Sequence, residues 1–170
     1  MNRRPLGIGI INFAYWMAKN DMTYSDPNLE MIDDWAEAWS YYLIKASNKI
    51  AQEKGPCKLN YQTKYSKGIM PVNTYKSEVN DLVPHDPQMD WNSLADDLRE
   101  YGIRNSTLMA LMPSETSSQI SNATNGIEPP PALVSIKQSK HGVLKQVVPG
   151  IFHLKNKYEL LWDQESPEGY

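Results

Sequence analysis

Cysteine is nearly absent from the sequence, and long apolar runs are missing. Cys57 is the single cysteine among 170 residues, which excludes an internal disulfide and a zinc site built from cysteines. No apolar run approaches the roughly 18 residues of a membrane-spanning helix, and the start of the chain lacks the pattern of a signal peptide. We therefore expect a soluble cytoplasmic protein with no membrane partner and no bound metal.

An excess of positive charge is also missing. The 17 Lys and Arg residues are outnumbered by 20 Asp and Glu residues, giving a formal net charge of −3. Without a basic field the chain is a poor binder of nucleic acid, and a single nucleotide is a better candidate ligand. The length suits one domain, and 41% hydrophobic with 22% charged residues is ordinary for a globular protein.

The most informative stretch begins with a short apolar run, Ser106–Met112, which predicts a buried strand that ends at Pro113. Hydroxyl and carboxylate side chains follow, and Ser117 or Ser118 is suited to cap a short helix that reaches about Ala123. A strand, a polar turn and a helix start predict an anion site, because the unpaired N–H groups of a first helical turn attract negative charge. On physics alone, an ordinary capped loop is an equally good interpretation.

Apolar spacing and capping residues predict four further helices. They are Leu6–Ala18, starting near Gly7 or Gly9; a long helix capped by Asp26, with Pro27 in its first turn and its stop at Lys54 and Gly55; Asp90–Tyr101, ending at Gly102; and Lys155 to about Gln164. In the long helix the apolar residues recur every three or four positions, which predicts one buried stripe. Its members are Ile32, Trp35, Trp39, Tyr42, Ala46 and Ile50.

Two apolar runs, Leu133–Gln138 and Val143–Val148, flank a polar turn and predict a β-hairpin. The stretch between Cys57 and Pro87 is irregular. Within it Cys57 is interpreted as a bystander and His85 as a solvated loop histidine, since neither has a partner at metal-ligand spacing. The order of helix, strand, polar loop and helix around residue 113 is typical of an α/β barrel.

Five segments also resemble a known family, in that family's order. They are Arg3–Tyr15, Tyr41–Asn48, Gly102–Leu108, Pro113–Pro130 and Tyr158–Trp162. Together they are similar to the large catalytic subunit of class I ribonucleotide reductases. The resemblance implies an α/β fold: a partial segment of that family's ten-stranded α/β barrel, spanning residues 1–170 and incomplete on its own. The family's N-terminal allosteric region, radical-cysteine loop and C-terminal tail have no counterpart here.

The resemblance also implies a reaction, the radical reduction of ribonucleoside diphosphates to deoxyribonucleoside diphosphates. Pro113, Ser114, Glu115, Thr116 and Ser117 match the family's diphosphate-binding positions. We expect Glu115 to act through its main chain, because its carboxylate would repel a phosphate. The family's scheme uses three thiols, so this chain is expected to supply no catalytic residue and to be inactive alone.

The remaining partners follow from the same resemblance. They are the rest of the large subunit, a separate metal-containing small subunit that supplies the radical, and thioredoxin or glutaredoxin as reductant; the chain itself is expected to bind no cofactor. Where the family has an arginine this sequence has Pro131, which removes a cation near the expected anion site. A non-catalytic remnant or a free nucleotide-phosphate binding module stays open as the alternative.

Overall fold

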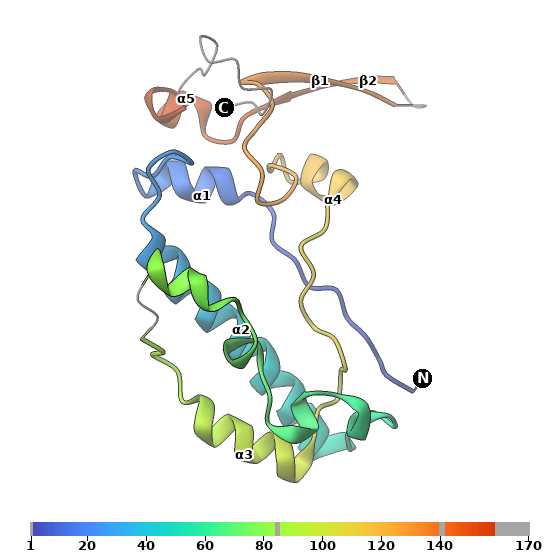
Figure 1. Cartoon of the computed structure of the whole chain (residues 1–170). Helices are drawn as coiled ribbons and strands as arrows, with labels where there is room; N and C mark the ends of the chain where they lie inside the picture. The colour runs from blue at the N-terminus through green and yellow to red at the C-terminus, as the bar shows by residue number, and fades with distance from the viewer. Residues whose placement is uncertain (1, 84–85, 140–141, 159–170) are drawn as a thin grey trace. The chain divides into compact units, whose positions relative to one another are not determined.

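The computed structural model describes residues 2–83, 86–139 and 142–158, and the chain divides into two compact units. Unit 1 combines Met1–Ile8 with Asn28–Ala110, and unit 2 combines Gly9–Pro27 with Leu111–Tyr170. Each unit is therefore assembled from two segments that are distant in the sequence, as the colours of Figure 1 show. His85 lies outside the described residues.

Unit 1 is organised by the long helix α2, Leu29–Lys54. The helix begins after Asn28, whose side chain accepts a hydrogen bond of 3.0 Å from the backbone N–H of Met31. The predicted cap, Asp26, is wrong, because its backbone N–H bonds the Thr23 hydroxyl at 3.0 Å in a separate turn. The predicted end is confirmed: Gly55 follows the last helical residue with a positive φ of 77°.

The buried face of α2 differs from the predicted stripe. Tyr42 is 60% exposed and Ile50 is 39% exposed, while Trp35 and Trp39 are half-buried and stack on each other with ring centroids 5.8 Å apart. Ala46 is exposed as well. Six other residues of α2 are buried. Three are polar, namely Glu37, Ser47 and Asn48, and the other three are Tyr41, Ile44 and Ala51.

Hydrogen bonds explain why this face is buried. The Asn48 amide donates to the backbone carbonyls of Asp97 and Gly102 at 3.1 and 2.9 Å. The Ser47 hydroxyl donates to the Asn105 side chain at 2.9 Å. Polar side chains of α2 thus hold the segment from Asp97 to Asn105 against α2 by hydrogen bonds. A prediction that counts only apolar residues cannot detect such a buried face.

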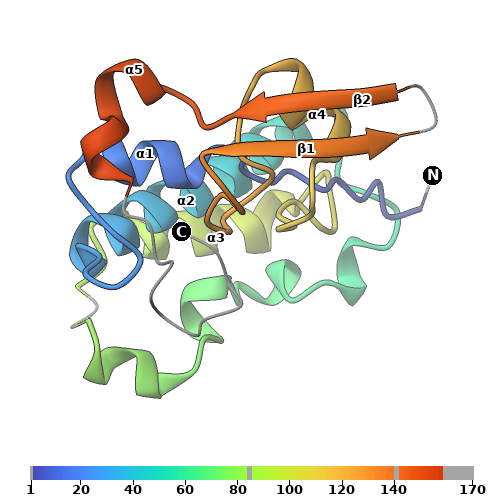
Figure 2. The same ribbon diagram turned by 90° about the horizontal axis from the view of Figure 1, so that it is seen from above.

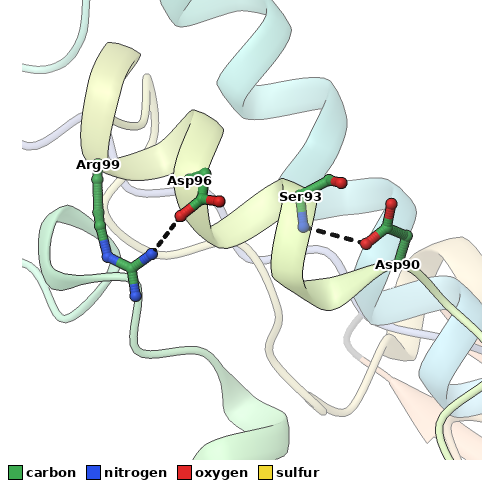
Figure 3. Close-up of polar contacts among 4 residues, drawn as sticks. All are labelled: Asp90, Ser93, Asp96 and Arg99. Carbon is green, nitrogen blue, oxygen red and sulfur yellow. Dashed lines mark hydrogen bonds and ion pairs between the residues drawn. The ribbon is translucent and has the colours of Figure 1, made fainter.

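The second helix of unit 1, α3, spans Trp91–Tyr101 as predicted and ends at Gly102. Figure 3 shows its capping residue Asp90, which accepts a 3.0 Å hydrogen bond from the Ser93 N–H. The same figure shows Arg99 donating to Asp96 at 2.6 Å on the solvent side. The hydrogen bonds from Ser93 lower the pKa of Asp90.

The core of unit 1 lies between α2, α3 and the segments that follow them. Between Cys57 and Pro87 the chain is irregular, as predicted, with short 3₁₀ turns at Asn60–Gln62, Tyr65–Lys67, Pro71–Asn73 and Ser77–Asp81. Met70 from this stretch and Leu108 from the later one reach the core. Its buried members are Tyr41, Ile44, Met70, Trp91, Leu94, Ala95, Leu98, Ile103 and Leu108.

The predicted strand Ser106–Met112 is only partly confirmed. Its first half is extended and runs parallel to the segment that precedes Gly9: the N–H groups of Leu6 and Ile8 donate to the carbonyls of Thr107 and Leu108 at 2.9 and 2.8 Å. One bridge forms, between Ile8 and Met109. Residues 6–8 run alongside residues 107–109 in this pairing and are not helical, so the predicted helix over Leu6–Ala18 does not begin there.

In unit 2 that helix begins later, as α1, Phe13–Lys19. Asn12, just before it, has a left-handed φ of 69°, which interrupts any helix entering from residues 6–11. The predicted β-hairpin is confirmed: β1, Val134–Ser139, and β2, Gly142–Val147, form an antiparallel pair with Val134 opposite Val147 (Figure 2).

A short helix α5, Ile151–Leu154, and a 3₁₀ turn at Lys155–Lys157 end the described part of unit 2. The predicted last helix, Lys155 to about Gln164, lies mostly outside the described residues. In the ranges that the structure describes, the hairpin is the one sheet, alongside the single parallel bridge. This mixture is consistent with part of an α/β fold.

Candidate functional site

The expected phosphate loop leads into helix α4, Glu115–Ile120, of unit 2. Ser114 is the residue before the helix, so the prediction that Ser117 or Ser118 would be the cap is wrong. The reason is the Ser118 side chain, which is fully buried: its one hydroxyl proton is shared between the Glu115 carbonyl and the Asn125 side-chain oxygen, each 3.1 Å away. Because these acceptors engage the hydroxyl inside the unit, it does not cap the first turn of a helix. The helix also ends earlier than Ala123.

The first turn of α4 presents donors to solvent. Among the described residues no acceptor faces the backbone N–H groups of Glu115, Thr116 and Ser117, whereas the Ser118 N–H donates to the Ser114 carbonyl at 2.8 Å. The side chains of Pro113, Glu115, Thr116 and Ser117 are exposed and that of Ser114 is half-buried. Three main-chain donors and nearby hydroxyls can therefore reach a ligand from water.

The charge of the ligand would be balanced by these donors more than by a helix dipole. Helix α4 has six residues, so few aligned peptide units contribute to the dipole, and its effect falls off within the first turn. Hydrogen bonds to an ionised acceptor are the stronger contribution, at about 1.5–3 kcal/mol each. The loop thus presents exposed hydrogen-bond donors, and none of Pro113–Ser117 has a cationic side chain.

Asn125 holds the loop in place, and the sequence analysis missed it. Its carbonyl accepts from the Ser114 N–H at 3.1 Å, and its side chain accepts from Ser118. The residues on either side of it are bound to the start of α1: Asn12 N–H donates to the Thr124 carbonyl at 3.0 Å, and Phe13 N–H donates to the Gly126 carbonyl at 3.3 Å. The one signal in the sequence was an Asn-Gly pair after a short helix, which marks a turn.

Pro131 and the loop residues Pro113–Ser117 do not line the same cavity. Pro131 lines a cavity of unit 2 together with Thr124 and Asn125, and none of Pro113–Ser117 lines that cavity. Pro131 therefore lies near Thr124 and Asn125, in the segment that follows α4, and it does not line a cavity with the first turn of α4.

Cys57 and Tyr41, two residues of unit 1, are part of its packed framework. Cys57 is 2% exposed, and its backbone N–H donates to the Ile103 carbonyl at 3.0 Å, so the thiol is enclosed in unit 1. Tyr41 packs edge-on against Trp91 with centroids 5.2 Å apart. Across residues 2–83, 86–139 and 142–158 no group of three His, Cys, Asp or Glu side chains could hold a metal ion. No helix in these ranges is long and apolar enough to cross a membrane.

Glu37 is a buried carboxylate that sequence reasoning did not find. It is 7% exposed and accepts from the backbone N–H groups of Gln88 and Met89 at 3.0 and 3.2 Å. The Trp91 indole N–H also donates to it, at 2.6 Å. These bonds tie the approach to α3 onto α2, so Glu37 is part of the framework of unit 1.

Comparison with known proteins identifies the family of this framework and loop. The family model for the ribonucleotide reductase barrel domain matches residues 1–166. The chain therefore belongs to the ribonucleotide reductase barrel-domain family, and its helices, hairpin and parallel bridge are a partial α/β segment of that domain.

Individual relatives agree with this assignment. The chain is 55% identical over 171 residues to ribonucleoside-diphosphate reductase 1 subunit alpha of Salmonella typhimurium, and 56% identical over 169 residues to ribonucleoside-diphosphate reductase subunit alpha of Haemophilus influenzae. It is 46% identical over 160 residues to the corresponding subunit of enterobacteria phage T4. These matches cover 100%, 99% and 94% of this chain but 22%, 22% and 21% of the relatives. The chain thus spans about a fifth of the length of these relatives.

Proposed function

We propose that the chain contributes the substrate diphosphate-binding loop of a ribonucleoside-diphosphate reductase large subunit and acts only together with the rest of that subunit. The observation that carries the proposal is the exposed set of donors at Glu115, Thr116 and Ser117, in a chain that matches the reductase barrel domain along nearly its whole length. Pro113 and Ser114 complete the loop that presents them.

The proposed role is binding and orientation. Main-chain N–H groups and the hydroxyls of Thr116 and Ser117 donate to phosphate oxygens, and the Glu115 carboxylate turns to solvent. Three or four charge-assisted bonds of about 1.5–3 kcal/mol each are enough to hold a diphosphate after part of its hydration is lost. When the loop holds the phosphates of a nucleoside diphosphate, it orients the ribose toward reacting groups that lie elsewhere in the subunit.

The chemical step needs groups that this chain lacks. Reduction of a ribose carbon by two electrons, started by a thiyl radical, uses three thiols, and Cys57 is the single cysteine and is buried. We infer that the thiols come from the rest of the large subunit, the radical from a metal-containing small subunit, and the electrons from thioredoxin or glutaredoxin. No nucleic acid takes part.

The binding role is tested by titrating cytidine diphosphate into the ¹⁵N-labelled chain, alone and together with a polypeptide that carries the remaining large-subunit barrel. The amide signals of Thr116 and Ser117 should shift and saturate, and Thr116→Val or Ser117→Ala should weaken binding about five- to tenfold, the effect of roughly one hydrogen bond. Thr74→Val, which exchanges an exposed hydroxyl for a methyl group in unit 1, is the matched control and should change nothing. Unmoved loop amides at saturating ligand would overturn the proposal.

A reductase assay on the same samples separates the proposal from its alternative. Deoxynucleotide should form only when the remaining subunit, the small subunit and the reductant are all present. Diphosphate binding that never leads to product in the complete mixture would favour the free binding module. Product from this chain alone would contradict the thiol argument.

A further inference from the structure

The segment that follows helix α4 is anchored to the helix itself. Asn122 has a left-handed φ of 49°. Its N–H donates to the Gln119 carbonyl at 3.2 Å, and the N–H of Ala123 donates to the Ser118 carbonyl at 2.8 Å. These two bonds are those of a Schellman motif. The last turn of α4 is therefore tied to the position of Ala123.

The same segment also holds the beginning of the loop. The Asn125 carbonyl accepts from the Ser114 N–H at 3.1 Å, and the Ser118 hydroxyl lies 3.1 Å from the Asn125 side-chain oxygen. The exposed N–H groups of residues 115–117 lie between Ser114 and Ser118 in the chain. The directions of these donors consequently depend on where residues 123–125 lie.

One side chain of the hairpin reaches this segment. Gln146, which lies on β2 opposite Ser135, donates from its amide nitrogen to the Ala123 carbonyl at 2.9 Å. Ala123 is 3% exposed, and a buried backbone carbonyl is costly to leave without a partner. Gln146 therefore links the hairpin to the segment that holds both ends of the donor-bearing turn.

A cavity of about 250 Å³ lies beside this hydrogen bond. Gln146 lines it, together with Thr124 and Asn125. Empty space provides no van der Waals contacts to the groups that face it. Packing on that side therefore supports residues 123–125 less, and the Gln146 hydrogen bond is a larger part of their support.

We infer that Gln146 is a positioning residue for the proposed phosphate loop. Its amide holds Ala123, and Ala123 holds the end of α4 through Ser118, so that the N–H groups of residues 115–117 keep the directions that a diphosphate needs. Hydrogen bonds weaken steeply as the donor tilts away from the acceptor, so a small rotation of this turn lowers affinity. The inference rests on the function proposed above, and Gln146 acts through Ala123 and not by touching the ligand.

The first test is Gln146→Met, which keeps the length of the side chain and removes the donor. With the polypeptide that carries the remaining large-subunit barrel present, cytidine diphosphate should bind this variant about fivefold more weakly, roughly the effect of one hydrogen bond. The ¹⁵N amide signals of Thr116 and Ser117 should move even without ligand. Parent affinity in Gln146→Met would overturn the inference.

Gln119→Met is the matched control. It makes the same chemical change at a half-buried residue of α4 whose side chain makes no hydrogen bond within the described ranges. Its affinity for cytidine diphosphate should differ from that of the parent by less than about twofold. If Gln119→Met weakens binding as much as Gln146→Met does, the loop responds to any loss of a glutamine amide and the inference is wrong.

Gln146→Glu separates a lost donor from altered packing. An ionised carboxylate has no proton to donate to the Ala123 carbonyl, whereas a protonated carboxyl has one. The ratio of the dissociation constants of variant and parent should be about fivefold or more at pH 7. It should fall toward one as the introduced carboxyl is protonated, at or above the ordinary pKa of about 4.3 because burial raises it.

Measuring the ratio at each pH removes the titration that both proteins share. The phosphates of the ligand titrate in both samples, as does Glu128, which is the one charged residue among the described residues that line the cavity. A ratio that stays constant between pH 7 and pH 4 would show that Gln146 acts by packing alone, and the inference would be wrong.

The inference and the proposed function fail in different ways. If the parent binds cytidine diphosphate and Gln146→Met binds it equally well, the proposed function stands and the positioning role is wrong. If the parent does not bind it, the proposed function is wrong. In that case movement of the Thr116 and Ser117 signals in free Gln146→Met would still support Gln146 as the residue that positions the loop, and unmoved signals would overturn that role too.

Discussion

The two units of the chain are stabilised in different ways. Unit 1 has a continuous apolar core of large side chains, with Ile44, Leu98 and Ile103 at 0% exposure. The buried apolar side chains of unit 2 are mostly small or flexible, namely Ala14, Met17, Ala18, Met22, Ala123 and Val148. Both units also expose large apolar side chains: Ile120 at 84% and Phe152 at 95% in unit 2, and Leu82 at 72% in unit 1.

Polar groups are also used differently in parts of the two units. Unit 1 spends its polar side chains on fixing helices to each other, as Asn48 and Glu37 do. In unit 2 the N–H groups of Glu115, Thr116 and Ser117 face no acceptor among the described residues. Each unit also has one buried hydroxyl without a hydrogen-bond partner, Ser40 in unit 1 and Thr124 in unit 2. The first N–H groups of a helix have no partner within the helix and can bond to water or to a ligand, so α4 is the part of unit 2 for which we propose a binding role.

The largest expected effect tests this comparison with one chemical change in both units. Ile44→Ala removes a fully buried side chain from unit 1 and should lower the free energy of unfolding by about 3–4 kcal/mol. Ile120→Ala makes the same change at a residue that is 84% exposed in unit 2 and should stay within about 0.5 kcal/mol. Urea unfolding followed by circular dichroism measures both. Similar losses would show that Ile120 is covered in solution.

Glu37 gives the next largest effect. Glu37→Ala removes the acceptor of the Gln88 and Met89 N–H groups and of the Trp91 indole. Buried donors left unpaired cost about 1–3 kcal/mol each, and relaxation would recover part of that, so a total loss of about 2–4 kcal/mol is expected. Glu53→Ala, an exposed carboxylate on the same helix, is the control for loss of charge. A loss no larger than the control would mean that the three bonds do not form.

A substitution at Pro131 in unit 2 is expected to strengthen diphosphate binding. Pro131→Arg adds a permanent cation to the segment that Asn125 links to the loop, and diphosphate should bind more tightly by about 1 kcal/mol or more, roughly fivefold or more. Ile136→Arg adds the same charge to an exposed position on β1 and should have little effect. Isothermal titration of a nucleoside diphosphate into both variants measures the difference. Unchanged or weaker binding in Pro131→Arg would place the position out of reach of the phosphates.

Local signals in the sequence predicted most elements, and tertiary pairing set the parts they missed. The caps of α3 and the two strands of the hairpin were predicted from the sequence, because capping residues and the alternation of apolar residues act within a few positions. The start of α1 was not, because Leu6 and Ile8 pair with a segment about a hundred residues away. The buried face of α2 was also missed, since Ser47 and Asn48 are buried by hydrogen bonds to loops that an apolar count ignores.

The candidate site shows the same division. The hydroxyl run at Pro113–Ser117 could be found from the sequence, and its resemblance to the reductase family gave it a proposed ligand. The helix start at Glu115 could not, because it depends on the inward bond from Ser118 to Asn125, seven residues ahead. The cavity beside Pro131 could not be predicted either, since its walls come from the segment after the loop and from the open end of the hairpin, where Ser135 lies opposite Gln146.

The smallest expected effect concerns Asp90, the residue that caps α3 in unit 1, and its contribution to stability at low pH. The hydrogen bonds from Ser93 hold the pKa of Asp90 below its ordinary value in the folded chain. A carboxyl with a lowered folded pKa adds stability that is present above its unfolded pKa of about 3.9 and is lost as the pH falls through the folded pKa. Asp90→Asn keeps a capping oxygen and cannot titrate, so its stability should lack this acid-dependent loss. The measurement is urea unfolding of both proteins between pH 5 and pH 2: the stability difference between parent and variant should shrink toward low pH. A difference that is constant over this range would show that Asp90 caps α3 without a change in its pKa. Glu53→Gln, at an exposed carboxylate of α2 in the same unit, controls for general loss of negative charge.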